Sequence, residues 1–240
     1  MKIAIRGGHS LDVRGAKGIL DEVNEDRIIT AATVSRLRSM GHQVLDVTPT
    51  YSGTSGVDLS TAVNKANAWG ADVFASIHLN AAGGKGTEVL YASDKGKIYA
   101  DRIVNKIAGL GFANRGAKVD VRGLYEFKKC WMPNVIIEVC FVDNQIDVDL
   151  YRKVGTQIIA NAIAEGITGD GWKSVNGIWY YFENGSSVRN AWRQDSSSRW
   201  FYLGANGAMI TNAWAQDSHG WCYCGNNGAW DGIHRTEAKL

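Results

Sequence analysis

The sequence is poor in proline and cysteine, and it has no long hydrophobic run. Only two prolines and four cysteines occur in 240 residues, and the cysteines do not form CxxC pairs. A disulfide scaffold and a cysteine-based zinc site are therefore not expected. The apolar runs have the length of β-strands, so none is long enough to cross a bilayer. We expect a globular protein that does not enter a membrane.

Charge of one sign is also scarce. The chain has 26 Lys and Arg residues against 24 Asp and Glu residues, which gives a formal net charge of +2. Nucleic-acid binders and polybasic membrane binders depend on a strong positive field, so neither kind of partner is expected. The first residues, MKIAIRGGHS, lack the hydrophobic stretch of a signal peptide. We therefore expect synthesis in the cytoplasm without a signal peptide.

Aromatic residues are unevenly distributed along the chain. Seven of the nine tryptophans lie beyond residue 170. A shift of composition marks a domain boundary, and the stretch Thr168-Gly-Asp-Gly171 has the composition of a short hinge. We therefore predict two domains, residues 1–168 and residues 169–240.

The first domain alternates strand-like and helix-like segments. Expected strands are residues 2–6, 43–47, 72–78, 87–91 and 135–141, and expected helices are residues 22–40, 59–69, 96–110 and 146–166. This alternation predicts an α/β domain with a twisted, mostly parallel or mixed sheet and flanking helices on both faces. Ligands of such sheets bind at the carboxyl ends of the strands.

The second domain contains a repeat. Aromatic runs begin at Trp179, Trp200 and Trp221, at intervals of 21 residues. An Asn-Gly pair follows each run, at residues 184–185, 206–207 and 227–228. Asn-Gly favours a type I′ hairpin turn, in which both central residues have positive φ. Because one hairpin is not stable alone, we predict three stacked hairpins that form a small all-β solenoid.

Two histidines follow expected strands of the first domain. His9 comes after the first strand and two glycines, and His78 ends the apolar strand DVFASIH. A single histidine in such a place is more often a hydrogen-bonded loop residue, but two at strand tips favour a metal site. A hydrolytic zinc site has three protein ligands and one open position. Glu22 is the candidate third ligand and Glu25 is the alternative, and either also suits the first turn of a helix.

Glu138 lies inside the apolar run VIIEVCF, where a carboxylate is costly unless it is paired or functional. A raised pKa in a dry site suits a general base that takes a proton from water and returns it to a leaving amine. The alternative is a buried salt bridge with Arg6 or Arg122. The sequence therefore makes Glu138 the candidate catalytic residue.

These motifs resemble those of zinc-dependent N-acetylmuramoyl-L-alanine amidases of the amidase-3 type, which include autolysins and phage endolysins. The resemblance spans residues 1–167. Its motifs are Gly-His after the first strand, Glu before the first helix, Ser-Ile-His-Leu-Asn-Ala at 76–81 and Ile-Glu-Val-Cys-Phe at 137–141. The family often has Gly-His-Gly-Gly, whereas Ser10-Leu11 follows the first histidine of this chain. The resemblance implies that His9, Glu22 and His78 bind Zn²⁺ and that Glu138 is the catalytic carboxylate.

The same resemblance implies a peptidoglycan hydrolase that cleaves the amide bond between N-acetylmuramic acid and the L-alanine of the stem peptide. Two alternatives stay open: a non-catalytic cell-wall-binding protein, and a zinc peptidase that cuts within the stem peptide. The expected absence of a signal peptide favours a phage-type endolysin released through a membrane lesion. A bacterial lysin exported by another route is the alternative.

The repeats are similar to choline-binding and related cell-wall-binding repeats. This resemblance implies that aromatic cages bind the choline of teichoic acid or another wall saccharide. The cage candidates are Trp172, Trp179, Tyr181, Trp192, Trp200, Tyr202, Trp214 and Trp221. Some repeats of this kind pair, so a homodimer through this domain is an open alternative.

The third repeat departs most from the others. Cys222 and Cys224 replace aromatic or aliphatic residues of the earlier repeats, and we expect packed thiols there, with oxidisable thiols as the alternative. The remaining histidines, His42, His219 and His234, are expected to have no functional role.

Overall fold

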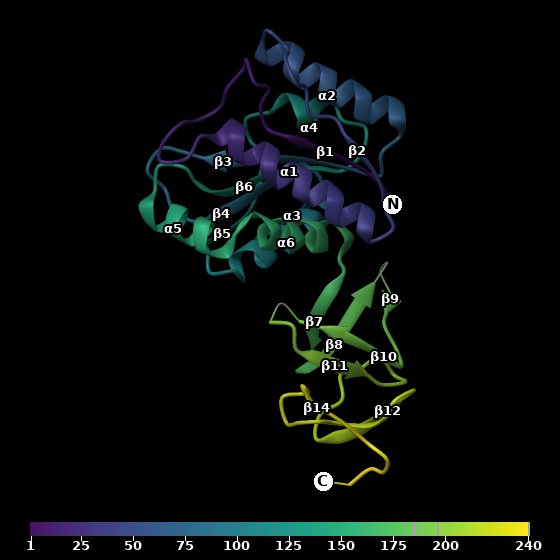
Figure 1. Ribbon diagram of the computed structural model, residues 1–240. Helices are drawn as coiled ribbons and strands as arrows, with labels where there is room; N and C mark the ends of the chain where they lie inside the picture. The colour runs from purple at the N-terminus through teal and green to yellow at the C-terminus, as the bar shows by residue number, and fades with distance from the viewer. Residues whose placement is uncertain (184–185, 196, 240) are drawn as a thin grey trace. The chain divides into compact units, whose positions relative to one another are not determined.

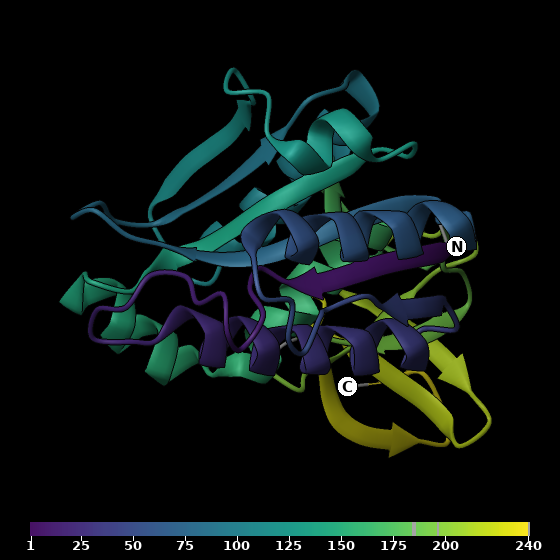
Figure 2. The same ribbon diagram turned by 90° about the horizontal axis from the view of Figure 1, so that it is seen from above.

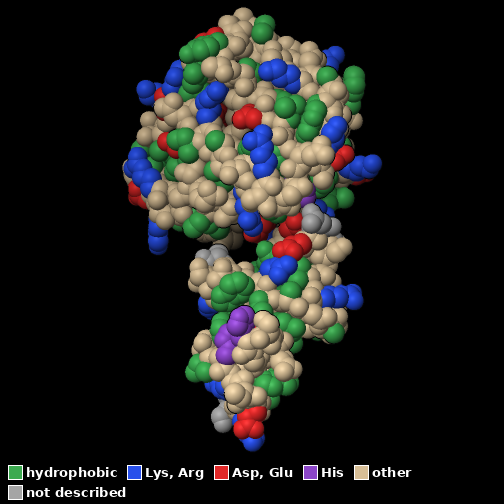
Figure 3. Space-filling model, turned by 45° about the vertical axis from the view of Figure 1, so that its right-hand side comes forward, with side chains coloured by type: hydrophobic (Ala, Val, Ile, Leu, Met, Phe, Trp, Pro, Cys, Tyr) green, Lys and Arg blue, Asp and Glu red, His purple; other side chains and the backbone are tan. Residues whose placement is uncertain are grey.

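The computed structural model describes residues 1–183, 186–195 and 197–239, and its chain divides into two compact units. The first unit is Met1–Ile167 and the second is Thr168–Leu240 (Figure 1). Within the described residues, no helix combines the length and the apolar composition that a membrane span requires. On the visible face of the first unit, Lys and Arg side chains are interspersed with Asp and Glu (Figure 3).

A six-stranded mixed sheet forms the centre of the first unit. Its strand order is β2-β1-β3-β6-β4-β5. The strands are β1 (Lys2–Gly7), β2 (Gln43–Asp46), β3 (Val73–Asn80), β4 (Thr87–Tyr91), β5 (Asn114–Val119) and β6 (Asn134–Phe141). Neighbours pair in parallel except β4 and β6, which are antiparallel. The predicted α/β class is confirmed, although the sequence analysis did not anticipate β5.

Helices cover both faces of the sheet. They are α1 (Glu22–Ser39), α2 (Ser55–Trp69), α3 (Asp94–Ala108), α4 (Tyr125–Lys129), α5 (Gln145–Val154) and α6 (Thr156–Thr168). Successive residues of a strand point to opposite faces. Ile5 of β1 therefore packs in one core with α1, α3 and α6, whereas Ala4 packs in a second core with α2. Figure 2 shows β1 (dark purple) between α2 (blue) and α1 (purple).

Local sequence signals explain where some helices begin and end. The Thr54 side chain accepts a hydrogen bond from the backbone N–H of Val57 and so caps α2. Helix α2 ends at Gly70, which has a φ of 69°. The single helix expected over residues 146–166 is wrong: Gly155 has a φ of 82°, so it ends α5 and a separate helix, α6, follows.

The second unit consists of small antiparallel hairpins, as the repeat predicted. The first sheet contains β7 (Gly171–Val175), β8 (Ile178–Glu183) and β9 (Ser186–Ser187), the second contains β10 (Ala191–Gln194) and β11 (Trp200–Leu203), and the third contains β12 (Ala213–Asp217), β13 (Gly220–Cys224) and β14 (Trp230–Arg235). Single bridges join Tyr180 to Ala208 and Phe201 to Ala229. Both partners advance by 21 residues, so the same contact links each hairpin to the next.

The Asn-Gly pairs do not all have the predicted turn geometry. Asn184–Gly185 lies outside the described residues. At residues 206–207 and 227–228 only the glycine has positive φ. The reason is local: the Asn206 side chain accepts a hydrogen bond from the backbone N–H of Ala208 (3.0 Å), which satisfies this turn without positive φ at the asparagine. Two successive positive φ values, 51° and 79°, occur at Asn176 and Gly177, between β7 and β8.

Candidate metal centre

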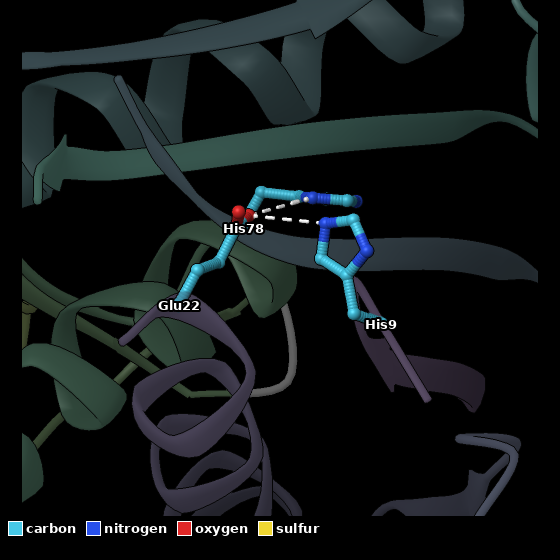
Figure 4. A group of neighbouring side chains, drawn as sticks. All are labelled: His9, Glu22 and His78. Carbon is cyan, nitrogen blue, oxygen red and sulfur yellow. Dashed lines mark hydrogen bonds and ion pairs between the residues drawn. The ribbon is translucent and has the colours of Figure 1, made fainter. Parts of the chain in front are cut away.

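Three of the predicted site residues converge from different elements of the first unit. His9 lies in the loop after β1, Glu22 is the first residue of α1, and His78 lies in the carboxyl-terminal half of β3. One ligand atom from each of the three lies within 4.8 Å of the other two. Figure 4 shows both imidazole rings directed toward the Glu22 carboxylate. Residues distant in the sequence thus form one group with two nitrogen donors and one oxygen donor.

The distances inside this group suit one metal ion. Glu22 Oε1 lies 3.1 Å from His78 Nδ1 and 3.4 Å from His9 Nε2. Around a tetrahedral zinc ion with bonds of about 2.1 Å, neighbouring oxygen and nitrogen ligands are about 3.4 Å apart. Two histidines and one glutamate are also a ligand set of known catalytic zinc sites. The residues present therefore fit a zinc ion with one open coordination position.

Further hydrogen bonds hold two of these side chains in place. The backbone N–H of Ala16 donates to Glu22 Oε2 (2.6 Å), and the backbone N–H of Leu79 donates to Glu22 Oε1 (3.1 Å). The second ring nitrogen of His78 lies 3.1 Å from the Ser76 hydroxyl. Partners of this kind set the orientation of a metal ligand and fix which ring nitrogen is available.

The charges of the three side chains support one another. Burial alone would raise the pKa of Glu22, but hydrogen bonds and charge from His78 and His9 lower it far below its usual range. Burial alone would lower the pKa of His78, but the hydrogen bond to Glu22 and the charges of Glu138 and Glu22 raise it to about 9. The site is therefore built around a strongly ionised carboxylate.

Two glycines make room for the group. A Cβ atom on Gly15 would collide with Glu22 Oε2 and His9 Nε2, and a Cβ atom on Gly8 would collide with the His78 ring. Neither glycine has positive φ, so close approach is what requires the missing side chain. No pattern in the sequence indicates this role for Gly15, because the contact depends on the path of the loop before α1.

Glu25, the alternative third ligand, lies elsewhere. Its Oε2 accepts a hydrogen bond from the Tyr151 hydroxyl (2.7 Å). Among the described residues of the first unit, the group of potential metal ligands contains Glu22 and does not contain Glu25. We therefore retain Glu22 as the proposed ligand.

Glu138 occupies the neighbouring strand beside this group. It lies on β6 in register with His78 of β3, and Glu138 Oε2 is buried without a hydrogen-bond partner among the described residues. Burial raises the pKa of Glu138, against the opposing charge of His78. Neither arginine forms a salt bridge with Glu138 among the described residues: Arg6 binds Asp58 and Glu126, and Arg122 lies 3.9 Å from Asp120 and acts on Glu138 only through its charge. The salt-bridge alternative is therefore not what the structure contains.

Asp26, which was not singled out from the sequence, lies on α1 one turn after Glu22 and is close enough to Glu22 and His78 to feel their charges. It is fully buried on α1, where its carboxylate interacts with the backbone N–H of His9 and the charge of Arg27. Burial raises the pKa of Asp26 to about 8, against the opposing charge of His78. Nothing in the sequence around Asp26 indicates that this aspartate is buried beside Glu22.

The aromatic candidates of the second unit form a repeated pair. In each hairpin a tryptophan contacts the tyrosine opposite it, with ring centroids 5.1 to 5.2 Å apart. These pairs are Trp172–Tyr181, Trp192–Tyr202 and Trp214–Tyr223. Trp192 also contacts Trp230, and neither Tyr223 nor Trp230 was among the predicted cage residues. A signal existed for Tyr223, which repeats the spacing of Tyr181 and Tyr202, whereas the residue one repeat before Trp230 is Met209.

The remaining cage candidates differ in exposure. Trp179 and Trp200 are 45% and 41% exposed, and they leave ring surface open to solvent. Trp221 is half-buried. Some rings already carry a cation of the protein itself: the Arg193 guanidinium lies 5.7 Å from the centre of the Tyr181 ring. The two exposed tryptophans are thus the rings most available to a ligand.

Family comparisons divide the chain at the same place as the structure. Residues 3–169 match the sequence profile of the N-acetylmuramoyl-L-alanine amidase family. Residues 170–186 and 190–209 match that of a cell wall binding repeat. These repeat matches fall on the first two hairpins.

Individual relatives are consistent with the family matches. An uncharacterised 38.4 kDa protein of Clostridium perfringens is 44% identical over 184 residues, which are 73% of this chain and 52% of that protein. The N-acetylmuramoyl-L-alanine amidase CwlM of Bacillus licheniformis is 31% identical over 70% of this chain and 67% of its own length. This chain therefore spans about half the length of the Clostridium perfringens relative.

Solved structures show the same fold. The catalytic domain of the CD27L endolysin, which targets Clostridia difficile, has a TM-score of 0.66 and 35% identity, over 73% of this chain and 99% of that domain. The catalytic domain of the amidase CwlV of Bacillus (Paenibacillus) polymyxa has a TM-score of 0.62 and 26% identity, over 70% of this chain and 97% of that domain.

Proposed function

The chain belongs to the N-acetylmuramoyl-L-alanine amidase family, and we propose that it is a zinc-dependent peptidoglycan hydrolase. The proposed reaction is hydrolysis of the amide bond between N-acetylmuramic acid and the L-alanine that begins the stem peptide. One observation carries this proposal: His9, Glu22 and His78 converge within 4.8 Å beside a buried, unpartnered carboxylate.

Each of the three converging side chains has a proposed role in holding the ion. His9 supplies Nε2, His78 supplies Nδ1 and Glu22 supplies Oε1, the atoms that already lie closest together. Zinc bound by three protein ligands supplies Lewis acidity, which acidifies water and polarises a scissile carbonyl. Gly8 and Gly15 keep the space around these donors free of side chains.

Glu138 is the proposed general base and general acid. Burial raises its pKa, so the carboxylate is a better proton acceptor than an exposed glutamate. It takes a proton from the attacking water as the new C–O bond forms. It then gives this proton to the L-alanine nitrogen as the C–N bond breaks, so one water is consumed and an acid and an amine are released.

The second unit is proposed to attach the enzyme to its insoluble substrate. Tethering raises the local substrate concentration without changing the chemistry. The exposed rings of Trp179 and Trp200 are suited to contact either a quaternary ammonium group or a sugar face, so teichoic-acid choline and another wall saccharide are both candidate ligands. A homodimer through these hairpins remains a prediction.

We place this activity at the bacterial cell wall, after cytoplasmic synthesis and release. The similarity to the catalytic domain of an endolysin supports this placement. A non-catalytic wall-binding protein would not need the converging donors, and their presence favours the enzyme.

Product analysis tests the reaction directly. Purified peptidoglycan is digested with the zinc-loaded full chain, and the new amino termini and reducing sugars are measured. We expect new L-alanine amino termini and no new reducing ends. Reducing ends would indicate a glycosidase, other amino termini would indicate a peptidase, and no product would indicate a binding protein. The matched control is Glu138→Gln.

A separate experiment identifies the ligand of the second unit. The full chain is applied to a choline-bearing resin and then eluted with free choline. Retention with choline-dependent elution would identify choline. Passage through the resin with binding to choline-free walls would identify a wall saccharide instead.

A further inference from the structure

The third hairpin differs from the second at one spot on its strands. In the second hairpin, Asp195 is paired with Arg199 at 2.6 Å. The equivalent aspartate of the third hairpin is Asp217, because each follows its repeat tryptophan by three residues. No arginine pairs with Asp217 among the described residues. Its charge is instead surrounded by histidine and cysteine side chains.

Three donors of different chemistry meet at this spot. Asp217 ends β12, Cys222 lies on β13 and His234 lies on β14. Cys222 and His234 are register partners across the two strands, so their side chains lie on the same face. The carboxylate, thiol and imidazole atoms all lie within 4.8 Å of one another. Among the described residues, this is the one such group that contains a cysteine.

The distances match the edges of a metal tetrahedron. Asp217 Oδ2 lies 3.3 Å from His234 Nε2 and 3.6 Å from Cys222 Sγ. With bonds of about 2.1 Å to nitrogen and oxygen and about 2.3 Å to sulfur, a tetrahedral zinc site has edges of about 3.4 Å (N–O) and about 3.6 Å (S–O). An ion would thus need little movement of these side chains.

A second histidine stands at the same place. His219 Nδ1 lies 3.8 Å from Asp217 Oδ1, and the rings of His219 and His234 are 5.3 Å apart. Histidine side chains are visible together on the surface of the second unit (Figure 3). The indole N–H of Trp192 donates to Asp217 Oδ2 (3.1 Å) and would orient the carboxylate from behind.

We propose that Asp217, Cys222 and His234 bind one divalent transition-metal ion of the zinc class, with His219 nearest the fourth coordination position. A thiolate and an imidazole favour this class over calcium and magnesium, which prefer oxygen ligands. Binding converts the Cys222 thiol to a thiolate, and the proton leaves to solvent. No CxxC spacing is required, because the donors come from three strands.

The electrostatics of the group agree with this assignment. Burial and the charge of Asp217 raise the pKa of Cys222 to about 11, so its thiol is neutral at pH 7 until an ion binds. Burial works against ionisation of Asp217, but the backbone N–H of His219 and the ring of His234 lower its pKa. An ionised carboxylate and two imidazoles are therefore already present for a cation.

The proposed ion would join all three strands of the third sheet. Its ligands all lie beyond residue 209, where the match to the cell wall binding repeat ends. The role we infer is structural: Cys222 stands one repeat after Phe201, whose ring packs on Trp172 of the first hairpin, and the ion takes the place of that aromatic contact in the third hairpin. Metal binding to a folded site stabilises that fold in proportion to the free ion concentration.

Cobalt titration of the full chain tests the proposal. Co²⁺ bound by a thiolate gives a charge-transfer absorption band in the near ultraviolet, whereas a site of two histidines and one glutamate gives none. We expect this band to saturate within two equivalents of added Co²⁺, because the proposed site of the first unit also takes one ion, and to disappear on addition of Zn²⁺. The readout does not depend on amidase activity, so it stands apart from the test of the proposed function.

Matched cysteine variants identify the thiolate that produces the absorption band. Cys222→Ala should abolish it, while Cys224→Ala, which removes another fully buried thiol from the same strand, should retain it. His234→Gln should lower the Co²⁺ affinity at least about tenfold. Circular dichroism of each variant shows whether the hairpins remain folded. The proposal is overturned if no band forms in the folded parent, or if the band survives Cys222→Ala.

Discussion

Replacing Glu138 by glutamine separates catalysis from metal binding and from stability. Gln is close to Glu in shape, so the change removes the proton-accepting carboxylate and leaves the packing of β6 in place. Glu138 is not one of the three residues whose donor atoms meet. Zinc binding should therefore persist in Glu138→Gln.

The expected loss of turnover follows from the role of a general base. Such a residue contributes about 100-fold to 10,000-fold to a rate, which corresponds to about 3 to 5 kcal/mol of transition-state stabilisation. Glu138 Oε2 has no hydrogen-bond partner among the described residues, so it is free to accept the proton of a water molecule. We expect kcat to fall by a factor in this range.

The folding stability of Glu138→Gln should not fall together with its turnover. A folded-state pKa above the unfolded value means that the folded state holds the proton more tightly. The stability contribution of Glu138 is thus present at low pH and is lost as pH rises through its folded pKa. Glutamine has no proton to lose, so at neutral pH the chelated variant should be at least as stable as the chelated parent.

Three measurements decide this prediction. Zinc content is measured by elemental analysis, unfolding by urea denaturation with and without chelator, and turnover by release of L-alanine amino termini. Near-normal turnover in Glu138→Gln would refute the assignment of the base. Loss of zinc from the variant would show instead that Glu138 helps to hold the ion.

The remaining predictions concern the ligands and their surroundings. Glu22→Gln should weaken zinc binding at least about 100-fold. The matched Glu25→Gln should keep zinc and cost about 1 kcal/mol of stability, because its amide oxygen still accepts the tyrosine hydrogen bond but without the charge. Equilibrium dialysis and urea unfolding distinguish the two variants, and equal zinc loss would contradict the choice of Glu22. Gly15→Ala should lose zinc while the fold survives, because its Cβ meets two ligand atoms; full zinc occupancy would be the contrary result. Because burial raises the pKa of Asp26 to about 8, its contribution to the stability of the chelated parent should be lost as pH rises from about 4 to 8, at up to about 1.4 kcal/mol per pH unit. Asp26→Asn should lose less stability over this range, and parallel stability curves would contradict this.

Local patterns in the sequence were sufficient for the elements that carry the site. Strands with continuous apolar runs predicted that His9 and His78 would lie at the carboxyl ends of β1 and β3, and the structure has both there. A carboxylate inside an apolar strand likewise predicted the unusual environment of Glu138. These inferences needed only residue type and periodicity.

Features that depend on tertiary contacts could not be predicted in the same way. Gly15 packs on Glu22 because of the path of a loop, and nothing in its neighbours indicates this. The group of Asp217, Cys222 and His234 forms because hairpin pairing brings three strands together, although these residues span 17 positions. From the sequence, Cys222 was expected to be a packed thiol beside Cys224, His234 was expected to have no role, and Asp217 was not singled out.

A crystal structure of the zinc-loaded chain with anomalous data at the zinc edge tests the proposed active site most directly. We expect a zinc peak about 2.0 to 2.2 Å from a nitrogen of His9, an oxygen of Glu22 and a nitrogen of His78, with the Glu138 carboxylate facing the open position. A fully active protein with no ion between these three residues would refute the proposed mechanism.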